Sequence, residues 1–527
     1  MLVKYSFMMI KLPFINTLSF ILICLCFINI VRADVLPKPV VIGPEQVQDW
    51  WKAGQHFVSQ SKVISQPQSR AKNIILFIGD GMGVSTVTAA RILAGQLAGK
   101  TGEENSLSFE TFPHLALSKT YSWDQQTPDS APTMTAMVTG YKAREGMLSV
   151  NQNTARFECD AQRVEQNRLE TLLEQAAVAG KSTGIISTAR LTHATPAANY
   201  AHTPYRDWEA DSLMPENCGV KDIARQFIEL KSAVFDSLKV VLAGGRGPFM
   251  PQTQADIEYP EKSGLRRDGR DLIAEWQLRQ SNVKHKAQYI WNQAEFDGVN
   301  PQATDYILGL FEPSHMQYEA DRVQDKAGEP SLSEMTEKAI ALLQKNKQGY
   351  FLQIEAGRID HAHHEGNAQR ALLDTIALSA AVKKAVERTN PNDTLIIVTA
   401  DHSHVFTIAG YPHRGNSILG LVKAVPKIDG NPVVADVDLH NKPYTTLGYT
   451  NGPGAKQHTE AGTARRDLSM VNTTLLDYKQ EAHIELEKET HGGEDVAIYG
   501  YGAGSQLIHG VMEQNWIYHV MREAFGF

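Results

Sequence analysis

Short runs rich in β-branched and other apolar residues alternate with amphipathic segments along the chain, and this alternation limits the possible folds. Strands are predicted at 73–79, 115–121, 183–188, 239–243, 350–355 and 394–400. Apolar residues three and four positions apart predict helices at 84–97, 169–179 and 371–388. Because strands alternate with helices, we expect an α/β fold with a large, mostly parallel sheet sandwiched between helices.

Two regions depart from this alternation. Residues 252–303 are polar and rich in Gly and Asp, which indicates a surface excursion, and 409–487 contain Gly-Pro turns typical of an inserted subdomain. Residues 34–70 precede the first strand and are expected to form an arm or a helix. The predicted catalytic core therefore covers 71–408 and is completed by 488–527.

The N-terminal 33 residues have the features of a secretory signal peptide. Lys4 and Lys11 precede an apolar run at 14–31, and Val31 and Ala33 are the small residues expected before a cleavage site. A membrane anchor is the alternative, because the run approaches spanning length. Loss of the three cations Lys4, Lys11 and Arg32 takes the formal charge from −8 to −11. We expect an exported protein, periplasmic or secreted, with no stable membrane span and no specific affinity for nucleic acid.

The four cysteines are consistent with export. Cys24 and Cys26 lie in the signal peptide, so Cys159 and Cys218 remain. Two cysteines in an exported chain most simply form one disulfide, and two buried free thiols are the alternative.

Acidic and histidine side chains follow three of the predicted strands, where open α/β sheets place their sites. Asp80 follows the first strand in Gly79-Asp80-Gly81-Met82-Gly83. A dinucleotide-binding turn has a different glycine spacing, and Asp80 would repel a pyrophosphate, so this turn suits a cation. A glycine-rich turn with a solvated Asp80 is the alternative.

Two later strands end in potential metal ligands. Glu355 is followed by Asp360 and His364, which are four residues apart and therefore on one face of a helix. The strand at 394–400 runs into Asp401-His402-Ser403-His404. Surface histidines are the alternative, but three strand ends with such groups favour a site with more than one metal ion.

Ser130 is the candidate nucleophile. The segment Asp129-Ser130-Ala131-Pro132 predicts a helix that begins at Ser130, since proline is tolerated in a first turn. Free N–H groups at a helix N-terminus favour an alkoxide and a phosphate. An ordinary capping serine is the alternative.

Five separated motifs resemble those of the alkaline phosphatases, in the same order. They are Gly79-Asp80-Gly81-Met82-Gly83, Asp129-Ser130-Ala131, His193-Ala194-Thr195-Pro196, Glu355 with Asp360 and His364, and Thr399-Ala400-Asp401-His402. The likeness covers most of 71–405, returns at 489–521, and is nearer to the animal-type (tissue-nonspecific or placental-like) branch than to the enteric bacterial enzyme. It implies a three-layer αβα fold with a crown-like inserted subdomain.

The resemblance also implies a role for each site residue. Ser130 is the nucleophile, and Asp129 and Arg206 bind the substrate phosphate. The implied ligand sets are Asp80, Asp401 and His402, with Ser130, at one Zn²⁺; Asp360, His364 and His491 at a second Zn²⁺; and Asp80, Thr195 and Glu355, with His193 beside them, at one Mg²⁺. His458 is the alternative third ligand of the second zinc ion, but the context of His491, just before a strand-like run, matches the animal-type enzymes.

Further expectations follow from the same resemblance. A calcium-type site would use Glu258, Glu312 and Glu329 with the carbonyl of Phe311, and solvated carboxylates are the alternative. Cys159 and Cys218 resemble a disulfide pair of the animal-type branch. Tyr411 resembles a dimer-interface residue, so a homodimer is expected.

The expected reaction is the hydrolysis of phosphate monoesters through a phosphoserine, with a rate optimum on the alkaline side. A phosphodiesterase or sulfatase of the same superfamily is the nearest alternative, and a secreted phosphate-binding protein with a disabled site is a more distant one. The motif residues address phosphate and metals, so they do not identify the natural substrate.

Overall fold

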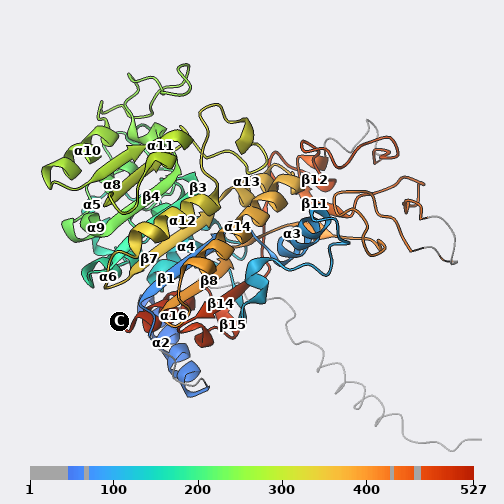
Figure 1. Ribbon diagram of the computed structural model, residues 1–527, viewed down its shortest axis with the longest axis horizontal. Helices are drawn as coiled ribbons and strands as arrows, with labels where there is room; N and C mark the ends of the chain where they lie inside the picture. The colour runs from blue at the N-terminus through green and yellow to red at the C-terminus, as the bar shows by residue number, and fades with distance from the viewer. Residues whose placement is uncertain (1–45, 65–69, 426, 428–432, 456–464) are drawn as a thin grey trace, which may run out of the picture. The chain divides into compact units, whose positions relative to one another are not determined.

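Ten strands form one sheet through the middle of the computed structural model, which describes residues 46–64, 70–425, 427, 433–455 and 465–527 (Figure 1). The strands lie in the order β15-β2-β14-β8-β1-β7-β3-β4-β6-β5. Their bounds are β1 Asn73–Gly79, β2 His114–Lys119, β3 Ser182–Arg190, β4 Leu238–Gly244, β5 Ala287–Ile290, β6 Tyr306–Leu310, β7 Tyr350–Ala356, β8 Thr394–Ala400, β14 Val496–Gly502 and β15 Gly510–Glu513.

The sheet is parallel except for β14, which pairs antiparallel with both β2 and β8. The six strands predicted from the sequence are all present, with ends shifted by no more than a few residues. The α/β prediction is therefore confirmed, and β14 shows that the C-terminal part of the chain returns to complete the sheet.

Helices cover both faces of the sheet, as Figure 1 shows. The α-helices are α2 Val47–Ile64, α3 Val84–Leu97, α4 Ser130–Thr139, α5 Ala161–Gln166, α6 Leu172–Val178, α7 Ala194–Ala197, α8 Ile223–Ile228, α9 Ser232–Ser237, α10 Leu272–Asn282, α11 Gln293–Gly298, α12 Leu332–Leu343, α13 Arg358–His364, α14 Ala368–Arg388 and α16 Trp516–Phe525. No helix among the described residues is long and apolar enough to cross a membrane.

Strand β1 shows how the two faces are filled. Side chains alternate along a strand, so Ile74, Leu76 and Ile78 join one hydrophobic cluster, while Ile75 and Phe77 join another. The first cluster packs under α4, α6 and α16, and the second packs under α3, α12 and α14. A strand that is buried on both faces reads as a continuous apolar run, which is the pattern of residues 74–78.

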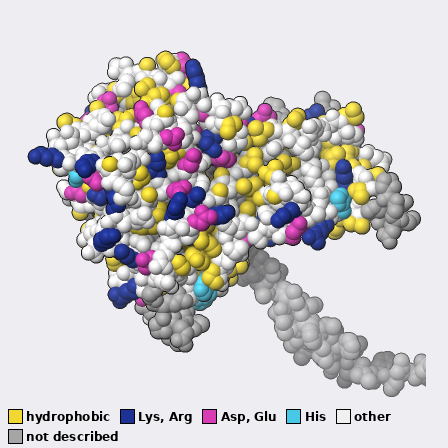
Figure 2. Space-filling model, viewed as in Figure 1, with side chains coloured by type: hydrophobic (Ala, Val, Ile, Leu, Met, Phe, Trp, Pro, Cys, Tyr) yellow, Lys and Arg dark blue, Asp and Glu magenta, His cyan; other side chains and the backbone are white. Residues whose placement is uncertain are grey.

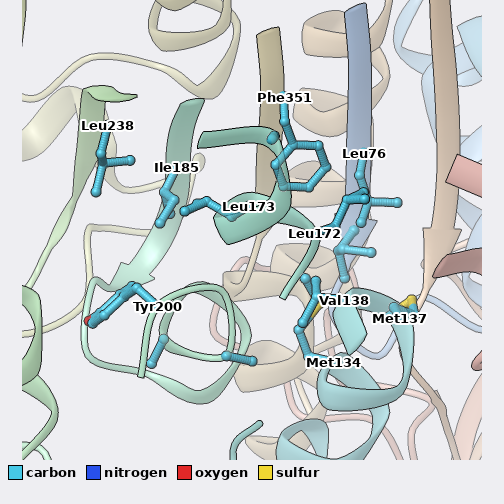
Figure 3. Packing of buried hydrophobic residues seen from close by; sticks show 14 of the residues in the cluster. Leu76, Met134, Met137, Val138, Leu172, Leu173, Ile185, Tyr200, Leu238 and Phe351 are labelled. Atoms are coloured by element: carbon cyan, nitrogen blue, oxygen red, sulfur yellow. The ribbon is translucent and has the colours of Figure 1, made fainter. Parts of the chain in front are cut away.

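Helix α4, which begins at Ser130, rests on the first of these clusters. Met134, Met137 and Val138 contact it from α4, and Figure 3 shows them in the same packed layer as Leu76 of β1 and Leu172 of α6. All ten residues of α4 are buried. This packing holds the N-terminus of α4 at a fixed position relative to the end of β1.

The segment predicted as a surface excursion, 252–303, is only partly irregular. Its second half forms α10, the edge strand β5 and α11, and Leu272 and Trp276 of α10 are buried. The high polarity of this segment concealed these elements, because an edge strand and its covering helix need only one apolar face.

The region 409–487 contributes to a separate, smaller sheet. Strands β10 (Phe406–Ile408), β11 (Leu447–Gly452) and β12 (Ala482–Glu485) form it, and a short pair joins β9 (Ser403–His404) to β13 (His491–Gly492). Cys159 and Cys218 form a disulfide, as expected. Charged side chains of both signs are interspersed over the face seen in Figure 2. The predicted signal peptide, 1–33, lies outside the described residues.

Candidate active site

Four adjacent strands, β8, β1, β7 and β3, deliver the site residues to one edge of the sheet. Asp80 directly follows β1, Glu355 lies at the end of β7, and Asp401 directly follows β8. Because the strands are parallel, their carboxyl ends meet at the same edge, and Ile78 of β1 lies beside Glu355 in the register. The side chains of Asp80, Glu355 and Asp401 are fully buried.

The turn after β1 requires a glycine at position 81. Gly81 has φ +67°, and a Cβ there would lie 2.3 Å from Nε2 of His404. Its N–H donates to Oδ1 of Asp401 at 3.0 Å. The glycine-rich turn therefore lets the backbone approach the histidine cluster closely, and it orients Asp401.

Ser130 is the first residue of α4, with Asp129 as the N-cap. Its Oγ lies 3.1 Å from Nε2 of His402 and 3.5 Å from Oδ1 of Asp80. The prediction that a helix begins at Ser130 is confirmed, and the hydroxyl faces both the strand ends and the positive end of the helix.

Asp80, Asp401 and His402 form the first group around this hydroxyl. Their potential ligand atoms lie within 4.8 Å of one another. Burial, reinforced by the nearby carboxylates, raises the pKa of Asp80 well above its usual value, and burial also raises the pKa of Asp401. Burial lowers the pKa of His402, so its neutral, metal-binding form is favoured.

Asp360, His364 and His491 form the second group. Nδ1 of His364 lies 2.5 Å from the carbonyl oxygen of Glu489, and Nδ1 of His491 lies 2.7 Å from that of Pro128. A carbonyl only accepts, so each Nδ1 carries the hydrogen and each Nε2 of the neutral rings is an acceptor. The two Nε2 atoms are 3.1 Å apart, and they lie 3.4 and 3.3 Å from Oδ1 of Asp360. Three acceptors that converge in this way fit a cation.

The two groups are neighbours. The rings of His402 and His491 stack with their centroids 3.6 Å apart, although 88 residues separate them in the sequence. Although burial favours the protonated form of Asp360, the histidines 364, 404 and 491 hold its pKa well below the usual value. The site therefore combines two adjacent sets of potential metal ligands around one serine.

A third group lies on the other side of Asp80. Oδ2 of Asp80, Oγ1 of Thr195, Oε1 of Glu355 and Nδ1 of His193 are buried and have no hydrogen-bond partner among the described residues. Burial raises the pKa of Glu355 to about 7. Three unpartnered oxygens are the ligand type that Mg²⁺ prefers.

Arg206 is held between two residues of the site. Its Nη1 donates to Oδ1 of Asp129 at 2.6 Å, and its Nη2 lies 2.9 Å from Nε2 of His193. A guanidinium only donates, so Nε2 of His193 accepts, and Nδ1 of the neutral ring carries the hydrogen. That hydrogen makes His193 a donor beside the third group rather than a ligand.

Two residues that the sequence analysis did not assign support the second group. Nε2 of His404 lies 2.9 Å from Oδ1 of Asp360, and its Nδ1 lies 2.6 Å from Oε2 of Glu489. Burial opposes the charge on His404, but Glu489 and Asp360 raise its pKa to about 10. The available signals were His404 in the Asp-His-Ser-His run and Glu489 two residues before His491.

The carboxylates of the calcium-type prediction are only partly brought together. Glu258 and Glu312 group with Asp325, which was not predicted, and these three residues are called the acidic cluster below. Oε1 of Glu329 accepts from the N–H of Gln317 at 2.8 Å, and the carbonyl of Phe311 accepts from Nη1 of Arg246 at 2.6 Å. No sequence pattern singled out Asp325, which lies in a loop with several acidic residues. His458 lies outside the described residues.

Comparisons with known proteins identify the family of this chain. The family model Alkaline phosphatase matches residues 71–527. The tissue-nonspecific isozyme of alkaline phosphatase from Rattus norvegicus is 45% identical over 491 residues, which cover 91% of this chain and 89% of that protein. The membrane-bound alkaline phosphatase of Bombyx mori is 41% identical over 464 residues, which cover 87% of this chain and 81% of that protein.

Solved structures agree on the fold. The alkaline phosphatase of Thermus thermophilus superposes with a TM-score of 0.59 at 22% identity, over 93% of this chain and 96% of that one. A serine at a helix N-terminus, ligand sets at adjacent strand ends and this sequence similarity lead to one conclusion. The chain belongs to the alkaline phosphatase family, whose members use metal ions, and it hydrolyses phosphate monoesters.

Proposed function

We propose that Ser130 is the nucleophile that accepts the phosphoryl group. The observation that carries this proposal is the position of its Oγ, at the N-terminus of α4, 3.5 Å from Oδ1 of Asp80 and 3.1 Å from Nε2 of His402. The free N–H groups of the first turn favour the negative charge of an alkoxide and of a bound phosphate. Asp80 Oδ1 is the carboxylate acceptor that faces the hydroxyl.

The three groups fit two zinc ions and one magnesium ion. Mixed histidine and carboxylate sets suit Zn²⁺. We assign Asp80, Asp401 and His402 to one ion and Asp360, His364 and His491, whose ligand atoms lie 3.1 to 3.4 Å apart, to the other. The oxygen set of Asp80, Thr195 and Glu355 suits Mg²⁺, with His193 as a donor beside it. When bound, the metal ions supply positive charge for the attacking and leaving oxygens and lower the pKa of water.

Arg206 is proposed to bind the substrate phosphate. Asp129 and His193 each take one of its Nη groups and so hold the guanidinium plane in one orientation. Its remaining N–H groups can donate to two phosphate oxygens, which is the geometry that arginine provides and lysine does not. Asp129 itself is fixed by the N–H groups of Ala131 and Gly146, at 2.6 and 2.8 Å.

The reaction then has two displacements at phosphorus. Oγ of Ser130 forms a bond to phosphorus while the bond to the alcohol oxygen breaks, and the alcohol leaves with a proton. Water then attacks the phosphoserine, the bond from phosphorus to Oγ breaks, and Ser130 recovers its proton. The chain's own residues position the serine, the phosphate and the carboxylates, and the burial of the site excludes bulk water from Asp80 and Asp401.

The direct test is hydrolysis of an aryl phosphate by Ser130→Ala. We expect loss of the burst and of turnover, because the other hydroxyl in the first turn of α4, that of Thr133, donates to the backbone carbonyls of Asp129 and Ser130. Ser232→Ala, an exposed serine in the first turn of α9, is the matched control and should keep wild-type activity. Wild-type turnover by Ser130→Ala would contradict the proposal. An aryl phosphate diester, tested in parallel, distinguishes a phosphodiesterase.

The remaining organisation is also proposed. Residues 71–408 and 488–527 would form the catalytic core, and 409–487 an inserted subdomain. Residues 1–33 would be a signal peptide that is removed on export, and the mature chain would form a homodimer. Tyr411 supports the dimer, because its side chain is 86% exposed, as expected for an interface aromatic. N-terminal sequencing tests the cleavage after Ala33. Light scattering of wild type and Tyr411→Glu tests the dimer, and an unchanged mass for Tyr411→Glu would contradict the role of this residue.

A further inference from the structure

A cavity of about 220 Å³ lies away from the catalytic centre, between α5, α6, α8 and α9. It shares no lining residue with the three ligand sets or with Arg206. Tyr200, Val164 and Val234 are among its apolar walls, and all three are buried. Figure 3 shows Tyr200 at the margin of the core cluster that also contains Leu172 and Leu173. At about 30 Å³ per water molecule, the cavity has room for a small organic molecule.

Two buried side chains meet at the wall of this cavity, His202 and Glu174. Both line it, and they are 8% and 5% exposed. Nδ1 of His202 lies 2.9 Å from the carbonyl oxygen of Ser149, so Nδ1 carries the hydrogen. Nε2 of the neutral ring is therefore an acceptor, and it has no hydrogen-bond partner among the described residues.

Glu174 presents a second acceptor to the same point. Its Oε1 lies 3.5 Å from Nε2 of His202. Oε2 is already used, because it accepts from the N–H of Thr171 at 3.0 Å in the capping box of α6. Oε1 also accepts from Arg168, so Nε2 of His202 is the acceptor of this pair that has no donor. A donor between the two atoms would pair with Nε2 and add a second hydrogen bond to Oε1, which favours a group with at least two N–H or O–H hydrogens.

The charges around the cavity balance. Arg168 donates to Oε1 of Glu174, and Lys221 pairs with Glu229 at 2.8 Å. Glu165 and Lys231, at the lining, are exposed. Since three basic and three acidic residues line the cavity, the lining carries no net charge, and Glu174 is its one buried carboxylate.

We propose that this cavity binds a small organic ammonium ion with an apolar body. Its N–H groups donate to Nε2 of His202 and Oε1 of Glu174, and its body contacts Val164, Val234 and the ring of Tyr200. An ammonium has three donors and a positive charge, so it satisfies both acceptors and pairs with Glu174. A hydroxyl has one hydrogen and satisfies only one of them.

The probe is benzylammonium, with benzyl alcohol as its neutral counterpart, and the full-length wild-type chain is titrated by calorimetry on the alkaline side of neutrality. We expect saturable binding of the amine and binding of the alcohol weaker by about tenfold or more, because a charged hydrogen bond contributes roughly 1.5–3 kcal/mol. No saturable binding of the amine, or equal binding of the two compounds, would overturn the proposal.

Two variants locate the binding. Glu174→Gln keeps the capping box but removes the charge, and it should weaken amine binding about tenfold. Glu165→Gln removes an exposed charge from the same lining and should bind like wild type. Ala161→Trp, at an exposed position beside the cavity, should abolish binding without removing a buried contact.

Two further results would overturn the proposal. Binding retained by Ala161→Trp would place the ligand elsewhere. A nitrogen NMR spectrum that shows His202 as an imidazolium under the same conditions would make His202 itself the donor to Glu174, and the cavity would then need no ligand donor.

Discussion

The catalytic centre and the acidic cluster are both built from buried carboxylates, but they are compensated in different ways. In the catalytic centre, the carbonyls of Pro128 and Glu489 fix the tautomers of His491 and His364, so that both rings present Nε2 acceptors to Asp360, while His404 donates to it. In the acidic cluster, protein donors serve Glu258 and Glu312, whereas both carboxylate oxygens of Asp325 are buried and have no partner among the described residues. Glu258 accepts from Arg246 at 3.0 Å, and Glu312 accepts from Tyr259 and Gln317.

The two regions differ in how much their stability depends on a bound cation. Asp360 and the Nε2 atoms of His364 and His491 are converging acceptors with one protein donor, His404, so a cation stabilises them. Glu258 and Glu312 share an arginine, a tyrosine and an amide, so the acidic cluster depends less on a cation. We therefore expect changes in the catalytic centre to act on catalysis and changes in the acidic cluster to act on stability.

Asp360→Asn should have the largest effect. It removes the one carboxylate between His364, His404 and His491, and the loss of several kcal/mol of transition-state stabilisation corresponds to about 10³-fold in kcat. Steady-state kinetics with an aryl phosphate, together with the zinc content by mass spectrometry, measure this. Full activity with two zinc ions bound would remove the distinction between the two regions.

Glu489→Gln should have a smaller effect on the same region. Glu489 holds His404, which in turn holds Asp360, and loss of such a supporting contact typically costs about 10–100-fold in metal affinity or activity. Competition with a zinc chelator measures the affinity. Glu487→Gln, an exposed residue two positions away, is the matched control and should not differ from wild type.

Asp325→Asn should act on stability instead. If the acidic cluster takes calcium, a concentration near 100 times the dissociation constant stabilises the folded state by about 2.7 kcal/mol. Thermal unfolding with and without calcium should show this increase in the free energy of unfolding in wild type and in the control Glu261→Gln. Asp325→Asn should show little of this increase, and its kcat should stay close to that of wild type. A loss of kcat in Asp325→Asn without a change in stability would reverse the comparison.

Asp374→Asn should have the smallest effect and an opposite sign. Burial raises the pKa of Asp374 from 3.8 to about 8, and its side chain lies in the same small cavity as Glu329. Between these pH values the folded state holds a proton that the unfolded state has lost, so the free energy of unfolding falls as the pH rises through this window.

The asparagine variant has no such proton to lose. We expect Asp374→Asn to flatten this part of the stability profile and to raise the melting temperature on the alkaline side by about 1–3 °C. Asp477→Asn, which changes an aspartate whose side chain is 88% exposed, should keep the wild-type slope. A wild-type slope in Asp374→Asn would show that another group is responsible.

Much of the fold was predictable because its signals are local. Residues 74–78 are apolar at every position since β1 is buried on both faces, and Asp129 precedes Ser130 as an N-cap must. The elements α10 and β5 escaped prediction because an edge strand shows only a weak pattern. Asp325 escaped because Asp321, Asp325 and Glu329 lie close together in the sequence, and nothing local marks which of them joins Glu258 and Glu312.

The sequence by itself indicated the family, the strands that end in polar residues, and the residue types of the proposed ligand sets, since these depend on short motifs. Only the tertiary structure decided which ring nitrogens face inward, because the carbonyls of Pro128 and Glu489 reach His491 and His364 only after folding. It also decided that Arg246 donates a hydrogen bond to the carbonyl of Phe311 and that His202 faces Glu174 in a cavity. Hydrogen-bond partners far apart in the sequence leave no local pattern, and they determine what a buried polar group can bind.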